Sequence, residues 1–254
     1  MKSGFGVFLV MIALVLSPFL GIAQRPSDFS LWTSTQLYYY FNKSNYASFQ
    51  YQNRFNENAS QFDNANLYFI YGHNFNKKNN IEVYYRLRTS YDEDVHTFFC
   101  GYNRKIKLKY FNLYGRVALQ HNRNYFTSKE DLDQSLTRAR FRLRAKYEIN
   151  KVFATTISAE PMVDLNGPES PNVDRIRYVA QFIIQYNKYQ SLTLFYNYQP
   201  DIHTFSVPEV NYVLGINYEI VLPSKGKSYK KLFKPDLKSE EGNDSNGKNH
   251  ADNQ

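Results

Sequence analysis

Between residues 31 and 222, hydrophobic and polar side chains alternate in successive runs that are separated by polar connections. Alternation with a period of two predicts β-strands, because successive side chains of a strand point to opposite faces. The predicted strands cover residues 31–41, 46–55, 64–75, 80–91, 95–105, 110–122, 136–149, 152–163, 175–186, 191–199 and 210–222. This pattern predicts an all-β fold built from consecutive hairpins.

The connections between the predicted strands fall into two alternating sets. Residues 42–45, 76–79, 107–109, 150–151 and 187–189 are short and rich in Asn and Lys, as hairpin turns are. Residues 56–62, 92–94, 123–134, 164–174 and 200–208 form a second set that is longer as a group. One rim of short turns and one of long loops is typical of outer-membrane barrels. We therefore predict an up-and-down, antiparallel transmembrane β-barrel.

One face of several predicted strands carries arginines, and the opposite face is apolar. The alternation is clearest in residues 136–149, where Arg138, Arg140, Arg142 and Arg144 share a face. A charge that faces lipid near the bilayer midplane costs about 2–4 kcal/mol, so the apolar face must point outward. The residues predicted to line the interior are Arg54, Glu82, Arg86, Arg88, Arg116, Arg138, Arg140, Arg142, Arg144, Glu160, Arg175 and Arg177.

Two interpretations of this interior remain open. In the first, the arginines surround a narrow, water-filled passage that favours small anions. In the second, they pair with Glu82, Glu148 and Glu160 and with Tyr68 and Tyr84, and so close the barrel of a structural envelope protein. The excess of arginines favours a positive interior in both interpretations.

The strand count conflicts with the expected position of the chain ends. Eleven strands cannot form an up-and-down barrel with both ends in the periplasm, because the first strand would then start outside the cell. Either residues 24–30 add a short strand, which gives twelve, or the first run lies outside the wall, which gives ten. We expect ten to twelve strands and favour twelve.

The N-terminal residues predict export and set the bounds of the predicted barrel. Lys2, an apolar run over residues 5–20 and small residues up to Ala23 are typical of a cleaved secretory signal, here residues 1–23. Residues 24–222 then form the barrel, and the polar residues 223–254 a disordered periplasmic tail. No later apolar stretch approaches the length of a transmembrane helix, so the chain must cross a membrane by strands. A mean hydropathy of −0.58 permits this, since only alternate residues face lipid.

The predicted location is the outer membrane, with membrane lipid and the barrel assembly machinery as partners and no nucleic acid. In the last strand Gly215, Tyr218 and Ile220 resemble the signal that this machinery reads, and we expect them on one lipid-facing stripe.

The sequence offers little for catalysis. The five histidines have no metal-like spacing, and Cys100 is the only cysteine. A lipid hydrolase on a barrel wall would need a histidine beside a serine and a polar residue that orients the ring. His121 with Asn122 is a loose candidate without an evident serine. We predict no enzyme, no catalytic residue, no metal and no cofactor, with an outer-membrane lipid hydrolase as the alternative.

Several short motifs, in order along the chain, resemble the outer-membrane barrels grouped as domain of unknown function 2490. They are Leu31-Trp32-Thr33, Gln52-Asn53-Arg54-Phe55, Tyr84-Tyr85-Arg86-Leu87-Arg88, residues 138–147, Ala159-Glu160-Pro161, Asp174-Arg175-Ile176-Arg177-Tyr178, Phe195-Tyr196-Asn197-Tyr198-Gln199 and residues 211–218. The resemblance covers most of residues 32–222. It implies a barrel in the outer membrane and no established activity.

Overall fold

A computed structural model describes residues 27–125, 135–167, 170–200 and 210–222 of the chain. In these ranges the chain forms eleven β-strands. The described residues contain no helix that is long and apolar enough to cross a membrane. The strands are β1 Ser27–Tyr40, β2 Asn45–Asn56, β3 Gln61–Asn74, β4 Asn79–Thr89, β5 Asp94–Lys107, β6 Asn112–Tyr125, β7 Ser135–Glu148, β8 Phe153–Asp164, β9 Asn172–Asn187, β10 Gln190–Pro200 and β11 Val210–Leu222. The predicted all-β fold is confirmed.

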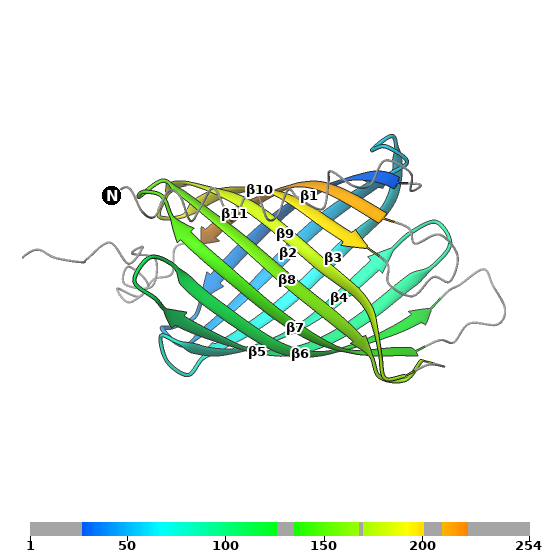
Figure 1. The fold of residues 1–254 in the computed structure, drawn as a ribbon, viewed down its shortest axis with the longest axis horizontal. Helices are drawn as coiled ribbons and strands as arrows, with labels where there is room; N and C mark the ends of the chain where they lie inside the picture. The colour runs from blue at the N-terminus through cyan, green and yellow to red at the C-terminus, as the bar shows by residue number, and fades with distance from the viewer. Residues whose placement is uncertain (1–26, 126–134, 168–169, 201–209, 223–254) are drawn as a thin grey trace, which may run out of the picture.

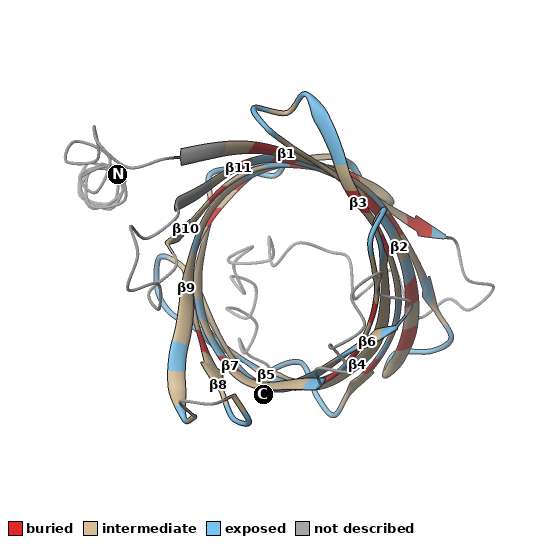
Figure 2. Ribbon diagram, turned by 90° about the vertical axis from the view of Figure 1, so that its right-hand side faces the viewer, coloured by how far each residue is buried: buried red, intermediate tan, exposed pale blue. Residues whose placement is uncertain are grey.

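The strands close into a barrel in which each strand pairs with its neighbours in sequence and β1 pairs with β11 (Figure 1, Figure 2). Pairs of consecutive strands are antiparallel, whereas β1 and β11 are parallel, from Ser27 opposite Val210 to Tyr39 opposite Leu222. An up-and-down barrel with an odd number of strands can close only in this way, because its first and last strands run in the same direction.

This closure corrects the strand number that we favoured. The described chain has eleven strands rather than twelve, and residues 27–30 lengthen β1 instead of forming another strand. The expectation that both ends of the barrel lie at one rim is also wrong. β1 starts at the rim from which β11 starts, and β11 ends at the opposite rim.

The rim that we call the short-turn rim carries the connections 41–44, 75–78, 108–111, 149–152 and 188–189. The opposite one, the long-loop rim, carries residues 57–60, 90–93, 126–134, 165–171 and 201–209. Only the last three of these exceed the turns of the other rim in length. The predicted difference between the rims therefore holds for the second half of the barrel and not for the first.

Asparagine side chains shape the short turns, as their sequence predicts. The Asn42 side-chain oxygen accepts hydrogen bonds from the backbone N–H groups of Ser44 and Asn45, both at 2.8 Å. Asn76, Asn150 and Asn187 bind backbone N–H groups in the same way in later turns. An asparagine that bonds the backbone two residues ahead mimics a turn, which is why these strands reverse within a few residues.

The barrel is apolar outside and polar inside. The buried set is dominated by polar residues, among them Asn66, Thr97, Asn197 and Glu160, which are at most 3% exposed. Large apolar side chains such as Phe69 and Phe98, both more than half exposed, point outward from alternate positions of the same strands. The period of two in the sequence thus becomes two chemically opposite surfaces.

Candidate functional site: an arginine-lined interior

Described residues line two spaces inside the barrel, and the larger of these, of about 620 Å³, is lined by arginines. Ten arginines and a single carboxylate, that of Glu160, face it from the described strands. Each arginine predicted for the interior belongs to this group: Arg54, Arg86, Arg88, Arg116, Arg138, Arg140, Arg142, Arg144, Arg175 and Arg177. They come from five strands, β2, β4, β6, β7 and β9, and all of them occupy inward-pointing positions of their strands.

Glu160 compensates two of these arginines. Its carboxylate binds Arg140, with 2.9 Å between Arg140 Nη2 and Glu160 Oε2, and it also accepts a short hydrogen bond from Arg116. Arg140 donates a further hydrogen bond to Gln120 Oε1 at 2.5 Å. Glu160 is 3% exposed and Arg140 9%. This buried group of one carboxylate and two guanidiniums ties β6, β7 and β8 together.

Near the long-loop rim, acidic side chains compensate three further arginines. Arg138 lies between Asp164 and Asp174, at 2.6 and 2.8 Å. Arg175 also binds Asp174, at 2.8 Å. Arg88 pairs with Glu93, which stands in the connection between β4 and β5. Charge at this end of the larger space is therefore largely balanced.

The remaining five arginines pair with no carboxylate in the described part of the chain. Three of them donate hydrogen bonds to neutral oxygens, Arg54 to Gln52, Arg86 to Thr97 and Arg177 to Gln199, at 2.8–3.0 Å. Arg54 also stacks on the Trp32 ring, with 3.8 Å from its guanidinium carbon to the ring centroid. The five residues are Arg54, Arg86, Arg142, Arg144 and Arg177. The larger space thus has an excess of positive charge.

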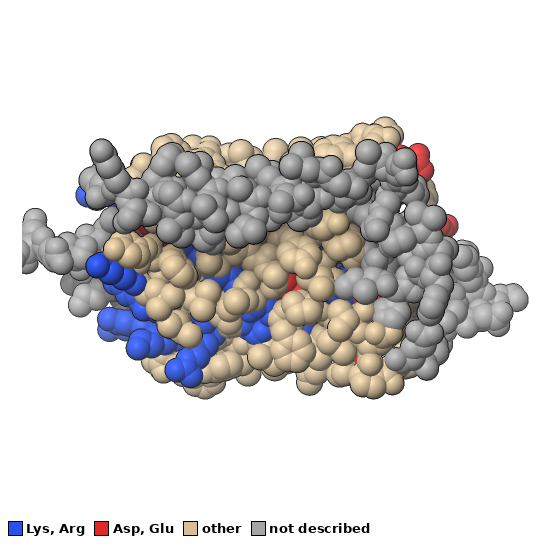
Figure 3. Space-filling view, viewed as in Figure 1, with Lys and Arg blue, Asp and Glu red and all other residues tan. Residues whose placement is uncertain are grey.

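The smaller space, of about 500 Å³, adjoins the short-turn rim. Glu82, the one predicted interior residue that does not line the larger space, lies here. It accepts hydrogen bonds from Tyr46 at 2.5 Å and from Asn103 at 3.2 Å, both neutral groups. Turn lysines such as Lys77 and Lys78 line its mouth, and Lys and Arg gather at this end of the molecule (Figure 3).

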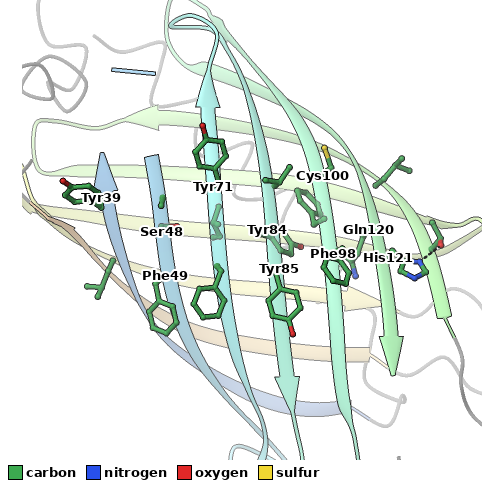
Figure 4. A pocket seen from close by; sticks show the side chains of 18 of the residues that line it. Tyr39, Ser48, Phe49, Tyr71, Tyr84, Tyr85, Phe98, Cys100, Gln120 and His121 are labelled. Carbon is green, nitrogen blue, oxygen red and sulfur yellow. Dashed lines mark hydrogen bonds between the residues drawn. The ribbon is translucent and has the colours of Figure 1, made fainter. Parts of the chain in front are cut away.

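A broad apolar hollow lies on the outer wall and extends across β1 to β7. Tyr39, Phe49, Tyr71, Tyr85 and Phe98 project from five neighbouring strands on this side (Figure 4). The outward positions of the strands therefore form a continuous aromatic surface. Within the described ranges, no group of three or more His, Cys, Asp and Glu side chains could hold a metal ion.

His121 stands at the edge of this hollow. A hydrogen bond of 3.0 Å joins its Nδ1 to the hydroxyl of Thr137 on β7 (Figure 4). Asn122, which we considered as its partner, points the other way and binds Thr97 and Gln120 in the interior. Consecutive residues of a strand face opposite sides, so an adjacent asparagine could not orient the ring.

The three residues of the expected assembly signal do not share a stripe. Gly215 lies on the inner face, where the Phe195 ring covers it so closely that a Cβ atom would overlap the ring. Tyr218 and Ile220 are an odd number of residues away and therefore lie on the outer face. The expected single stripe is wrong, and an assembly role for these residues stays a prediction.

Sequence reasoning missed several residues around the arginines. Trp32 stacks on Arg54, Gln120 binds Arg140, and Tyr114 lies under Arg144, 4.7 Å from the guanidinium carbon to the ring centroid. Trp32 belongs to the same period-two series as Ser34 and Gln36, which also line the larger space. Extending the inward parity along β1 would have found it.

The fold and the interior define a class: a closed β-barrel with an apolar outer wall and an arginine-rich interior. Residues 29–203 match the model of a family described as "Protein of unknown function (DUF2490)". Because the match spans more than half of the chain, the chain belongs to this family, which confirms the resemblance noted in its motifs. A comparison with curated proteins found no match.

Proposed function

We propose that this barrel resides in the outer membrane and forms a narrow passage that favours small anions. The observation that carries the proposal is the lining of the larger interior space, with ten arginines against one carboxylate. Rings of arginine and lysine select anions in protein pores, because they replace part of the hydration shell that the ion gives up. Five of these arginines have no described carboxylate partner and remain available to a passing ion.

The outer wall supports the proposed location. Exposed aromatic and aliphatic side chains cover it, which in water would be an extensive unprotected apolar surface. In a bilayer the same surface contacts hydrocarbon, and the closed strand ring satisfies the backbone hydrogen bonds. Outer-membrane lipid and, during biogenesis, the barrel assembly machinery are then the partners.

Planar-bilayer recording of the purified full-length chain tests the passage. Under a potassium chloride gradient, the reversal potential should have the sign of a chloride-selective current. A cation-selective current would overturn the proposal. The absence of current from correctly folded barrels would instead favour a closed structural barrel. Cell fractionation tests the location, with the chain expected in the outer-membrane fraction.

A lipid hydrolase is a second candidate, and one observation favours it. The hydrogen bond between His121 and Thr137 puts an imidazole beside a hydroxyl group on the apolar outer wall. A hydroxyl nucleophile on such a surface needs a neighbouring base, and His121 could serve as one. If detergent-solubilised protein hydrolyses phospholipid, and the variants His121→Ala and Thr137→Val do not, the barrel is an enzyme and our expectation of no catalysis is wrong.

A further inference from the structure

The two interior spaces meet at a group of shared lining residues. The arginines in this group come from β6 and β7, and the other residues come from β1 to β4. The shared residues are Gln36, Gln50, Tyr68, Tyr84, Arg116, Arg142 and Arg144. An ion that moves from one space to the other must pass these side chains, so their chemistry decides what can stay there.

The register of β6 and β7 brings the arginines of this junction close together. Arg116 lies directly opposite Arg142, and Tyr114 lies opposite Arg144. Residues directly opposite each other in an antiparallel pair have Cβ atoms about 4.5–5.5 Å apart, and like charges there destabilise the pair. Arg142 and Arg144 are two positions apart on one strand and share a face. Three guanidinium groups therefore converge on the junction.

The described carboxylates compensate this convergence only in part. Glu82 lines the smaller space with these arginines, but it binds Tyr46 and Asn103 and forms no ion pair with the three arginines. Glu160 binds Arg116, but it is also engaged by Arg140. Arg142 has no hydrogen bond or ion pair with any described residue, and its side chain is only partly buried. Arg144 packs on the Tyr114 ring, and its Nε is buried without a hydrogen-bond partner. An uncompensated cation that is partly withdrawn from water is unfavourable, and a ligand that supplies negative charge would compensate it.

We propose that Arg116, Arg142 and Arg144 hold a phosphate group at this junction, as inorganic phosphate or as a small phosphate monoester. The inference rests on the proposed function, since it needs an interior that anions can enter. The planar guanidinium fork matches two oxygens of a phosphate, and several forks can share one phosphate. The hydroxyl of Tyr84 and the amide of Gln50 offer neutral donors around the same point, whereas Tyr68 and Gln36 already donate to Gln52 and Ser48.

A phosphate fits this arrangement better than chloride or a monocarboxylate does. It is largely dianionic near neutral pH and has enough acceptor oxygens to meet three guanidiniums at once. Chloride carries one charge and has no directional acceptors, and a carboxylate has two oxygens and one charge. Glu160 is the only described carboxylate that forms an ion pair with any of the three guanidiniums, and it is shared with Arg140, so the remaining positive charge favours the more highly charged anion.

Calorimetric titration of the folded, full-length chain in detergent with inorganic phosphate tests this site. We expect saturable binding that Arg142→Gln weakens by about tenfold or more, because the variant removes a charge-assisted hydrogen-bond donor. Arg88→Gln is the matched control: it removes the same charge from the same space, but at an arginine that Glu93 already compensates. Its effect on affinity should stay below about twofold. A parallel titration with glycerol 3-phosphate separates free phosphate from a monoester.

Arg142→Lys serves if the glutamine variant does not fold, because it keeps the charge and loses the fork, and we expect it to weaken binding too. Binding that is not saturable, or that Arg88→Gln and Arg142→Gln weaken equally, overturns the site. The proposed function fails separately. Anion-selective current without saturable phosphate binding would support the passage and contradict the phosphate site. Saturable binding that Arg142→Gln weakens, in a barrel without current, would support the phosphate site and contradict the passage.

Discussion

In the half of the interior nearer the long-loop rim, Glu160 lies between Arg116 and Arg140, whereas in the other half Glu82 accepts hydrogen bonds from Tyr46 and Asn103. Both glutamates occupy inward positions within a strand. One balances two buried cations, and the other belongs to a neutral hydrogen-bond network. The neighbours across the strands, rather than the residue type, decide what an interior carboxylate does.

The cations of the two halves differ as well. In the larger space, arginines project from strands, and several are held by carboxylates, ring contacts or neutral oxygens, as Arg86 is by Thr97. In the smaller space, lysines such as Lys77 and Lys78 belong to a short turn and are exposed. Immobile charge in a confined space acts strongly on a passing ion, and solvated charge at a rim is screened. In the proposed passage, ion selectivity should therefore originate in the larger space.

The largest expected difference between the halves is in stability. Glu160→Gln leaves Arg116 and Arg140 without their shared carboxylate, and removing one partner of a buried ion pair costs about 3–5 kcal/mol. Glu82→Gln keeps neutral partners and should cost about 1 kcal/mol. The temperature at which the folded, fast-migrating form is lost on a gel compares the two variants. Equal losses of thermal stability in the two variants would show that the two carboxylates contribute equally to the stability of the barrel.

A smaller difference is expected in ion selectivity. Arg86→Gln removes a charge from the larger space. Two unit charges 4 Å apart interact by about 1 kcal/mol even in water, so the variant should lower the ratio of chloride to potassium permeability by a factor of about five. Lys78→Gln removes an exposed charge at the rim, which solvent and salt screen. Its effect on the permeability ratio should therefore be less than half of the effect of Arg86→Gln. Reversal potentials in planar bilayers measure both. A larger effect of Lys78→Gln would move the selective region to the short-turn rim.

The smallest difference concerns Trp32, the only tryptophan of the chain, which reports on the larger space by its fluorescence. Positive potential concentrates anions locally, so iodide should quench Trp32 more efficiently than caesium does. Arg54→Gln removes the guanidinium stacked on the ring and should lower the ratio of iodide to caesium quenching by roughly half. An unchanged ratio would mean that this potential does not arise from Arg54.

The inward and outward faces could be predicted because they depend on a local period of two. The position of Arg140 relative to Ala139 and Phe141 is enough to assign it to the polar side of β7. The same rule placed all ten arginines around one space. It was misapplied once, to Gly215 and Tyr218, which are three residues apart and so cannot share a face.

The partners and the closure could not be predicted, because both depend on register between strands. Nothing in the sequence near Glu82 and Glu160 distinguishes the carboxylate that meets two arginines from the one that meets a tyrosine. His121 likewise meets Thr137 only because β6 and β7 pair with these two residues opposite each other. The strand number failed for the same reason, since no local pattern indicates that β1 pairs in parallel with β11.

The parallel seam makes the two ends of the barrel depend on each other during folding. Every other strand pair joins neighbours in sequence, whereas the hydrogen bond from Ser34 to Asn217 across the seam joins residues 183 positions apart. Contacts of such long range form late, because the entropy of closing a large loop opposes them. Until β11 is in place, one edge of β1 is unpaired, and in the proposed membrane location such an edge would not be tolerated in hydrocarbon. Among the described strands, β11 is therefore needed to protect β1.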